Sequence, residues 1–310
     1  MLSRRQIRIK VLQSLYAFFQ AEKNDLSVAE RELFRSIEKV NELYIYLLLF
    51  IKELAESDQN DAGDLHLKFF PRQEELLASR RLFELKFIRS LGESKVFSDQ
   101  LLFLKISWQK NLDLVRKVFL EIKKSEFYRS FLKDDKASEK DFLLELIRKF
   151  IESSEAVQNQ IDEENIFWSD DFNFAIHLVL RTVRTYYDNE KLELVPLYKD
   201  ETDDKEFARQ LFCQTILHNK EFEKSISERT KNWEVDRIAL MDILILKMAL
   251  AELITFPNIP VKVSINEFID ISKEYSTPKS KQFVNGVIDK LANDYKEQGK
   301  IVKTGRGLIN

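Results

Sequence analysis

Two strings near the end of the 310-residue chain decide the fold: Ile259-Pro-Val-Lys-Val-Ser-Ile-Asn-Glu267 and Thr277-Pro-Lys-Ser-Lys-Gln-Phe-Val-Asn-Gly-Val-Ile-Asp-Lys290. Their apolar residues recur at intervals of three and four, which is the spacing of one helix face. Thr277 followed by Pro278 fits the N-cap and first position of a helix. The strings therefore predict helices over 264–275 and 278–297.

The rest of the chain carries the same helical pattern. It contains only six glycines and five prolines, so helix breakers are scarce, and no run alternates as a strand does. Ser3 with Gln6 and Ser27 with Glu30 match the capping box of a helix start. We predict an all-α protein, with the remaining helices near 3–22, 27–57, 72–91, 95–107, 109–133, 138–152, 170–189, 203–218 and 234–255.

Two polar, acidic stretches are predicted to be linkers, one over 57–63 and the other over 193–204. We expect three parts of the chain. They are an N-terminal helical region over 1–135 with an arginine-rich first helix, a C-terminal helical region over 136–298, and a flexible tail over 299–310.

Composition argues against several classes of protein. The longest apolar run, Leu43–Ile51, is far shorter than the roughly 18 residues of a membrane span, and no basic-then-apolar leader begins the chain. The single cysteine, Cys213, cannot form an internal disulfide or a thiolate metal cluster. We expect a cytoplasmic protein that does not enter a membrane.

The sequence also contains none of the common motifs of enzymes. The three histidines lie in no metal-ligand spacing, and six glycines cannot build a Walker loop, a dinucleotide fingerprint or a nucleophile elbow. We predict that the protein is not an enzyme, with no catalytic residues, no metal and no cofactor.

The strongest electrostatic feature is the basic N-terminus. Arg4, Arg5 and Arg8 precede the first acidic residue, Glu22. On a helix, Arg4 and Arg8 lie one turn apart, and Tyr16 lies two turns further on. Guanidinium groups beside an aromatic ring suit single-stranded RNA, because they bind phosphates while the ring stacks on a base. The alternative is an ordinary solvated helix face.

The sequence also resembles a known family. The two C-terminal strings follow Trp233-Glu-Val-Asp-Arg237 and Met248-Ala-Leu-Ala-Glu-Leu253, and the basic N-terminus runs into the pair Leu15-Tyr16. These strings resemble the signature of the NusB family of transcription antitermination factors. The resemblance covers about 203–297, with a second patch over 3–20. The stretch between them, roughly 25–200, is longer than a compact member needs.

The resemblance implies a NusB-like helical bundle, here with additional helices in the middle of the chain. It further implies an RNA-binding antitermination factor that recognises the single-stranded boxA element of ribosomal RNA operons together with NusE, a small-subunit ribosomal protein, within the RNA polymerase antitermination complex. The residues that it assigns to RNA are Arg4, Arg5, Arg8, Tyr16 and Phe283, with Lys279 and Lys281 as flanking phosphate contacts. Asp242 is expected to face the protein partner.

Three alternatives stay open at this point. Asn266, Asn285 and Gly286 are interpreted as structural residues that cap, cross-link or closely pack helices. Phe283 is either a core residue or an RNA contact. The whole chain is either an RNA-binding factor or a helical protein-interaction scaffold that has lost RNA binding.

Overall fold

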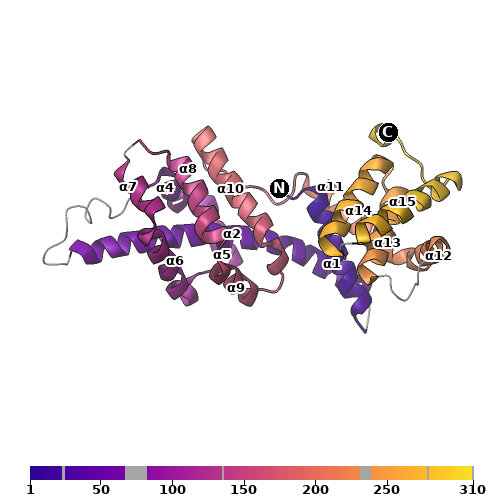
Figure 1. The fold of residues 1–310 in the computed structure, drawn as a ribbon, viewed down its shortest axis with the longest axis horizontal. Coiled ribbons are helices and arrows are strands. Elements are labelled where there is room, and N and C mark those ends of the chain that lie inside the picture. The colour runs from indigo at the N-terminus through magenta and orange to yellow at the C-terminus, as the bar shows by residue number, and fades with distance from the viewer. Residues whose placement is uncertain (23–24, 67–81, 135, 231–238, 278, 309–310) are drawn as a thin grey trace. The chain divides into compact units, whose positions relative to one another are not determined.

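The computed structural model describes residues 1–22, 25–66, 82–134, 136–230, 239–277 and 279–308 (Figure 1). This part of the chain contains helices and no strand, which confirms the predicted all-α class. None of the helices described is both long and apolar enough to cross a membrane. The Trp233–Arg237 string lies outside the described residues.

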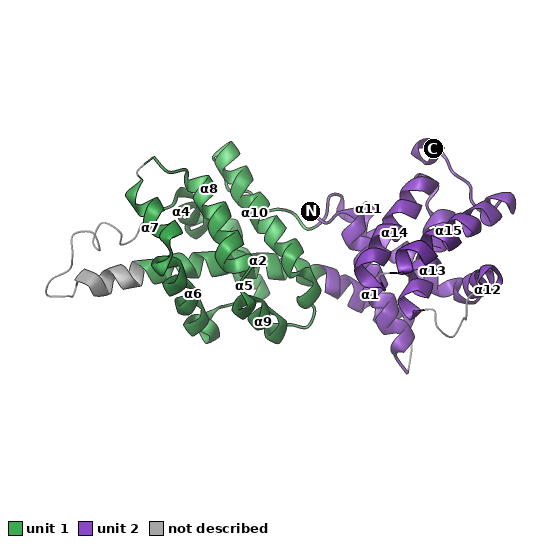
Figure 2. Cartoon of the chain, in the orientation of Figure 1, with its two compact units in different colours: residues 1, 38–197 green, residues 2–37, 198–310 purple. Residues whose placement is uncertain are grey.

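The chain divides into two compact units (Figure 2). Unit 1 comprises residue 1 and 38–197, and unit 2 comprises 2–37 and 198–310. The division differs from the boundary expected at 135/136, because the first helix belongs with the C-terminal helices rather than with the middle of the chain. One break falls inside the predicted linker 193–204.

Unit 1 is built around three aromatic rings. Trp108 stacks on Tyr46 with ring centroids 4.2 Å apart, and the ring centroid of Trp168 lies 5.0 Å from that of Tyr46. The indole Nε1 of Trp108 donates to the carbonyl oxygen of Tyr46 at 3.0 Å. The helices of this unit are the part of α2 (Leu26–His66) from residue 38, α4 (Lys86–Glu93), α5 (Lys95–Leu104), α6 (Leu112–Lys124), α7 (Glu126–Lys133), α8 (Glu139–Leu146), α9 (Glu155–Glu164) and α10 (Phe172–Asn189).

Several helix boundaries in unit 1 differ from the predictions. The helix expected over 109–133 is divided at Ser125, whose hydroxyl accepts from the amide of Tyr128 and so caps a new helix. The linker expected over 57–63 is wrong, because α2 continues to His66. Helix α9 was not predicted, although Ser154 caps it in the same way.

Unit 2 is centred on α13 (Leu240–Thr255), a mostly apolar helix that is buried along most of its length. It contacts the other long helices of the unit on several sides. A helix that is apolar on all sides requires such a position. Its neighbours are α1 (Arg4–Gln20), α11 (Glu201–Leu217), α12 (Asn219–Arg229), α14 (Val261–Tyr275) and α15 (Ser280–Glu297).

The start of α1 confirms the predicted capping box, since Ser3 and Gln6 satisfy each other's backbone amides. The second predicted box is wrong. Asp25 rather than Ser27 caps α2, because its carboxylate accepts from the amides of Ser27 and Val28 at 2.8 and 3.1 Å. An ionised carboxylate is the stronger acceptor at a positive helix end.

The expected flexible tail is packed against the loop before α14. The amide of Thr304 donates to the carbonyl oxygen of Pro257 at 3.0 Å, and Lys303 Nζ donates to that of Phe256 at 2.9 Å. A Cβ at Gly307 would overlap the carbonyl oxygen of Pro257, so only glycine fits there. A short 3₁₀ helix, Gly305–Leu308, ends the described chain.

Candidate nucleic-acid interface

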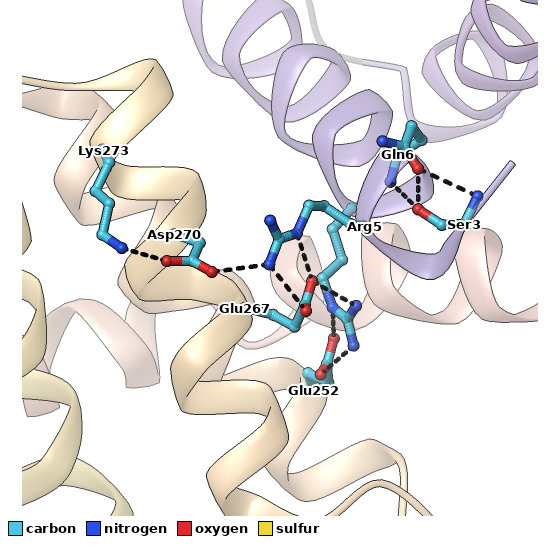
Figure 3. Close-up of polar contacts among 8 residues, drawn as sticks. Ser3, Arg5, Gln6, Glu252, Glu267, Asp270 and Lys273 are labelled. Carbon is cyan, nitrogen blue, oxygen red and sulfur yellow. Dashed lines mark hydrogen bonds and ion pairs between the residues drawn. The ribbon is translucent and has the colours of Figure 1, made fainter. Parts of the chain in front are cut away.

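The three arginines of α1 each meet carboxylates from other helices of unit 2. Figure 3 shows Arg5 between Glu267 and Asp270 of α14, with Lys273 on the far side of Asp270. The basic N-terminus is therefore not a uniformly solvated face, and its three guanidinium groups differ in exposure.

Arg8 lies in the interior. Its side chain is 3% exposed, and it forms a bidentate pair with Glu252 of α13 through Nε at 2.6 Å and Nη2 at 2.8 Å. Glu252 is fully buried, and Ser264 of α14 donates a further hydrogen bond to it at 2.7 Å. A buried carboxylate with a bidentate partner has its charge and its lone pairs satisfied together. Arg8 consequently joins α1 to α13, and the predicted RNA role for Arg8 is wrong.

Arg5 is about one-third exposed. Its Nε and Nη2 donate to the two carboxylate oxygens of Glu267 at 3.0 and 3.1 Å, and Nη2 also donates to Asp270 at 2.8 Å. The hydrogen bond to Glu267 raises the pKa of Arg5, so the guanidinium stays charged. Hydrogen bonds from Lys273 and then from Arg5 lower the pKa of Asp270.

Arg4 is also about one-third exposed and faces α11. It pairs with Asp203, and its Nε lies 3.3 Å from Asp204 Oδ1. The guanidinium carbon lies 4.2 Å from the centre of the Phe207 ring, within the range of a cation–π contact. The ring packs against the guanidinium group of Arg4, whose side chain remains partly accessible to solvent.

A cleft of about 930 Å³ opens beside these arginines. Its walls come from the starts of α1 and α14, from one face of α11, from the loop before α14 and from the C-terminal segment. The residues that line it are Ser3, Arg4, Arg5, Arg8, Asp203, Glu206, Phe207, Gln210, Phe256, Pro257, Asn258, Ile259, Pro260, Val263, Glu267 and Arg306.

The remaining predicted RNA contacts lie outside this cleft. Tyr16, Lys279 and Lys281 are exposed, and among the described residues neither lysine has an ion pair. Tyr16 sits on α1, whereas Lys279 and Lys281 flank the start of α15. All three side chains are accessible to a ligand.

The structure corrects the roles predicted for Phe283 and Asp242. Phe283 is 6% exposed and belongs to the buried face of α15, so it is a core residue and not an accessible stacking platform. Asp242 is buried as well, and it accepts from the hydroxyl of Ser280 at 2.7 Å. It therefore joins α13 to α15 and does not face a partner.

The structural interpretation of three motif residues also fails. Asn266 and Asn285 are exposed, and neither caps nor cross-links a helix among the described residues. Gly286 is exposed, and a Cβ there would meet nothing within 4 Å. The Asn285-Gly286 pair belongs to the accessible face of α15, which sequence reasoning assigned to packing.

Sequence reasoning missed the acidic residues that hold the arginines. Glu252 is 244 positions from Arg8 and Glu267 is 262 positions from Arg5, and no local pattern joins them. One signal was present: Arg8 lies next to Ile7 and four residues before Leu12, two buried positions of the same helix. Among the described residues, no group of acidic, histidine or cysteine side chains could hold a metal ion.

Several known proteins resemble part of this chain in sequence. The sequence model of the NusB family matches residues 175–293. The transcription antitermination protein NusB of Salinibacter ruber is 42% identical over 140 residues, covering 42% of this chain and 87% of the relative. That of Geobacter sulfurreducens is 34% identical over 121 residues, covering 37% and 88%, and that of Chloroherpeton thalassium is 39% identical over 106 residues, covering 34% and 50%. No solved structure matches the chain significantly.

The fold and these matches define the class: an all-helical protein of the transcription machinery rather than an enzyme. The chain belongs to the NusB family. The match confirms the resemblance seen in the C-terminal strings, and it does not include residues 38–174, which are most of unit 1.

The burial of Phe283 leads to a stability prediction. Phe283→Ala should lower the free energy of unfolding by about 3–5 kcal/mol, because it opens a cavity in the core. Lys281→Ala, two positions away on the exposed face, is the control and should change it by less than about 0.5 kcal/mol. Urea denaturation measures the free energy of unfolding of both variants. An equally small change in the two would contradict the burial of Phe283.

Proposed function

We propose that the chain is a transcription antitermination factor that binds boxA-type single-stranded RNA of ribosomal RNA operons together with NusE, in the cytoplasm and within the RNA polymerase antitermination complex. The observation that carries the proposal is the 42% identity over 140 residues to a protein named as a transcription antitermination protein. Membership of the NusB family adds the fold on which that function would rest.

The accessible cations and the exposed aromatic ring define the proposed RNA-binding surface. It consists of Arg4, Arg5, Tyr16, Lys279 and Lys281, without Arg8 and Phe283. The two lysines supply positive charge that no carboxylate among the described residues neutralises. Tyr16 offers an exposed ring on which a base can stack.

Arg4 and Arg5 can exchange a carboxylate for a phosphate. Each is about one-third exposed, and ion pairs with this access to water contribute only about 0–1 kcal/mol. A phosphate offers the same bidentate geometry as the carboxylate that it would replace. Arg8 cannot make this exchange, because its removal from Glu252 would leave a buried charge without a partner.

Salt dependence tests the arginine assignment. Arg4→Ala combined with Arg5→Ala should flatten the slope of log affinity against log salt by about 1.4, since each phosphate contact on a single strand contributes roughly 0.7. The measurement is a titration of labelled boxA RNA, with NusE present, at several salt concentrations. A scrambled strand should bind more weakly to the wild-type protein.

Lys110→Ala combined with Lys117→Ala is the matched control, because it removes two exposed cations from unit 1. It should keep the wild-type slope. Circular dichroism should show unchanged helicity in both double variants. A wild-type slope in the arginine variant would remove Arg4 and Arg5 from the RNA-binding surface.

A second candidate is a protein-interaction scaffold that keeps the family fold without RNA binding. The observation favouring it is in unit 1, where Leu102 and Phe103 of α5 are 76% and 80% exposed. Large apolar side chains side by side at this exposure are typical of a surface that binds another protein.

Capture of NusE separates the two candidates. With the antitermination function, the wild-type chain should retain more NusE when boxA RNA is added, because protein and RNA bind together. Leu102→Ser with Phe103→Ser should leave this RNA-dependent capture unchanged. NusE capture that does not change when boxA RNA is added, or that is lost in the serine variant, would favour the scaffold.

A further inference from the structure

The C-terminal segment brings a fourth arginine to the cleft beside α1. Arg306, in the 3₁₀ helix Gly305–Leu308, lines the cleft together with Arg4, Arg5 and Arg8. The arginines of α1 are each held by carboxylates. Arg306 is exposed and has no ion pair or hydrogen bond from its side chain within the described residues.

The position of Arg306 is fixed by the backbone around it. Thr304 and Lys303 donate hydrogen bonds to the carbonyl oxygens of Pro257 and Phe256, and Gly307 allows the close approach to Pro257. The amide of Gly307 also donates to the carbonyl oxygen of Thr304 at 2.8 Å. Arg306 therefore stands at the cleft on an anchored turn.

The start of α14 faces the same cleft, through Ile259, Pro260 and Val263. This helix has no side-chain cap and no acidic residue in its first turn. The amide groups and the positive end of the helix dipole there favour an anion. An unpaired guanidinium and an uncapped helix start thus line the same cleft.

Carboxylates also line the cleft. Asp203 pairs with Arg4 and Glu267 pairs with Arg5, whereas Glu206 pairs with Arg209 of its own helix. A phosphate that binds Arg4 or Arg5 must therefore displace a carboxylate, whereas Arg306 is unpaired among the described residues and needs no such exchange.

Apolar side chains also line the cleft. The half-buried ring of Phe256 lies 4.8 Å from Phe207, and Pro257 and Ile259 extend the surface. Flat apolar surface next to a cationic group is the arrangement that accepts an unstacked base with its phosphate. Asn258 also lines the cleft, and because its Oδ1 accepts from the hydroxyl of Thr304 at 3.3 Å, its amide nitrogen is the group that can donate to the polar rim of a base.

We propose that this cleft is a nucleotide subsite for the bound RNA strand. Arg306 and the start of α14 hold a phosphate, and the ring of Phe256 receives the adjoining base. The subsite rests on the proposed RNA-binding function and extends it to the C-terminal segment.

Arg306→Ala tests the subsite in the full chain with NusE present. The affinity for labelled boxA RNA should fall on the order of tenfold, because a charge-assisted contact is lost. The salt slope should flatten by about 0.7. Lys224→Ala is the control, because it removes an exposed cation from α12 outside the cleft. Its affinity for labelled boxA RNA should stay within about twofold of that of the wild type.

Phe256→Leu provides a second arm, since leucine keeps apolar volume but has no aromatic face. The affinity for boxA RNA should fall several-fold. A cooperative unfolding transition in urea should show that the variant is folded.

The outcomes separate the subsite from the function on which it rests. Wild-type preference for boxA over a scrambled strand, with Arg306→Ala no weaker than Lys224→Ala, would overturn the subsite alone. Equal wild-type affinity for the two strands would overturn both the subsite and the proposed function. Loss of NusE capture in Arg306→Ala without loss of RNA affinity would assign the cleft to the protein partner and overturn the subsite.

Discussion

The buried pair of Arg8 and Glu252 is the interaction on which unit 2 depends. Two full charges lie in the interior, where isolated ions are strongly disfavoured, and they are tolerated because the contact is bidentate and Ser264 completes it. The pair joins α1, α13 and α14, which come from opposite ends of the chain. With Arg8 fixed inside, Arg4 and Arg5 lie at the edge of the helix and remain partly accessible.

This arrangement gives the basic N-terminus two roles. Arg8 is structural, whereas Arg4 and Arg5 are partly exposed, and in the proposed function a phosphate replaces their carboxylate partners at small cost. Three cations without an ion pair in the described part of the chain, Lys279 and Lys281 at the start of α15 and Arg306 in the 3₁₀ helix Gly305–Leu308, come from other elements of unit 2. The proposed RNA-binding function therefore draws on both ends of the chain.

Local chemistry in the sequence predicted most of the helices and the capping box of Ser3 and Gln6, but it missed α9 and α12. It did not predict which side chains are buried at the ends of the chain, because Arg8 and Glu252 are 244 positions apart and periodicity describes only near neighbours. Phe283 shows the same limit, because its position in the helical pattern alone did not decide whether its ring is buried or exposed. The family strings predicted the class of protein, but not the division into units or the anchored C-terminal turn.

A double-mutant cycle between Arg8 and Glu252 tests the central claim most directly. The free energies of unfolding of the wild type, Arg8→Met, Glu252→Gln and the double variant give the coupling between the two side chains. The buried bidentate pair predicts a coupling of about 3 kcal/mol, with the double variant losing less stability than the sum of the losses in the two single variants. A coupling near zero would show that the two groups do not interact in the folded protein and would contradict the account.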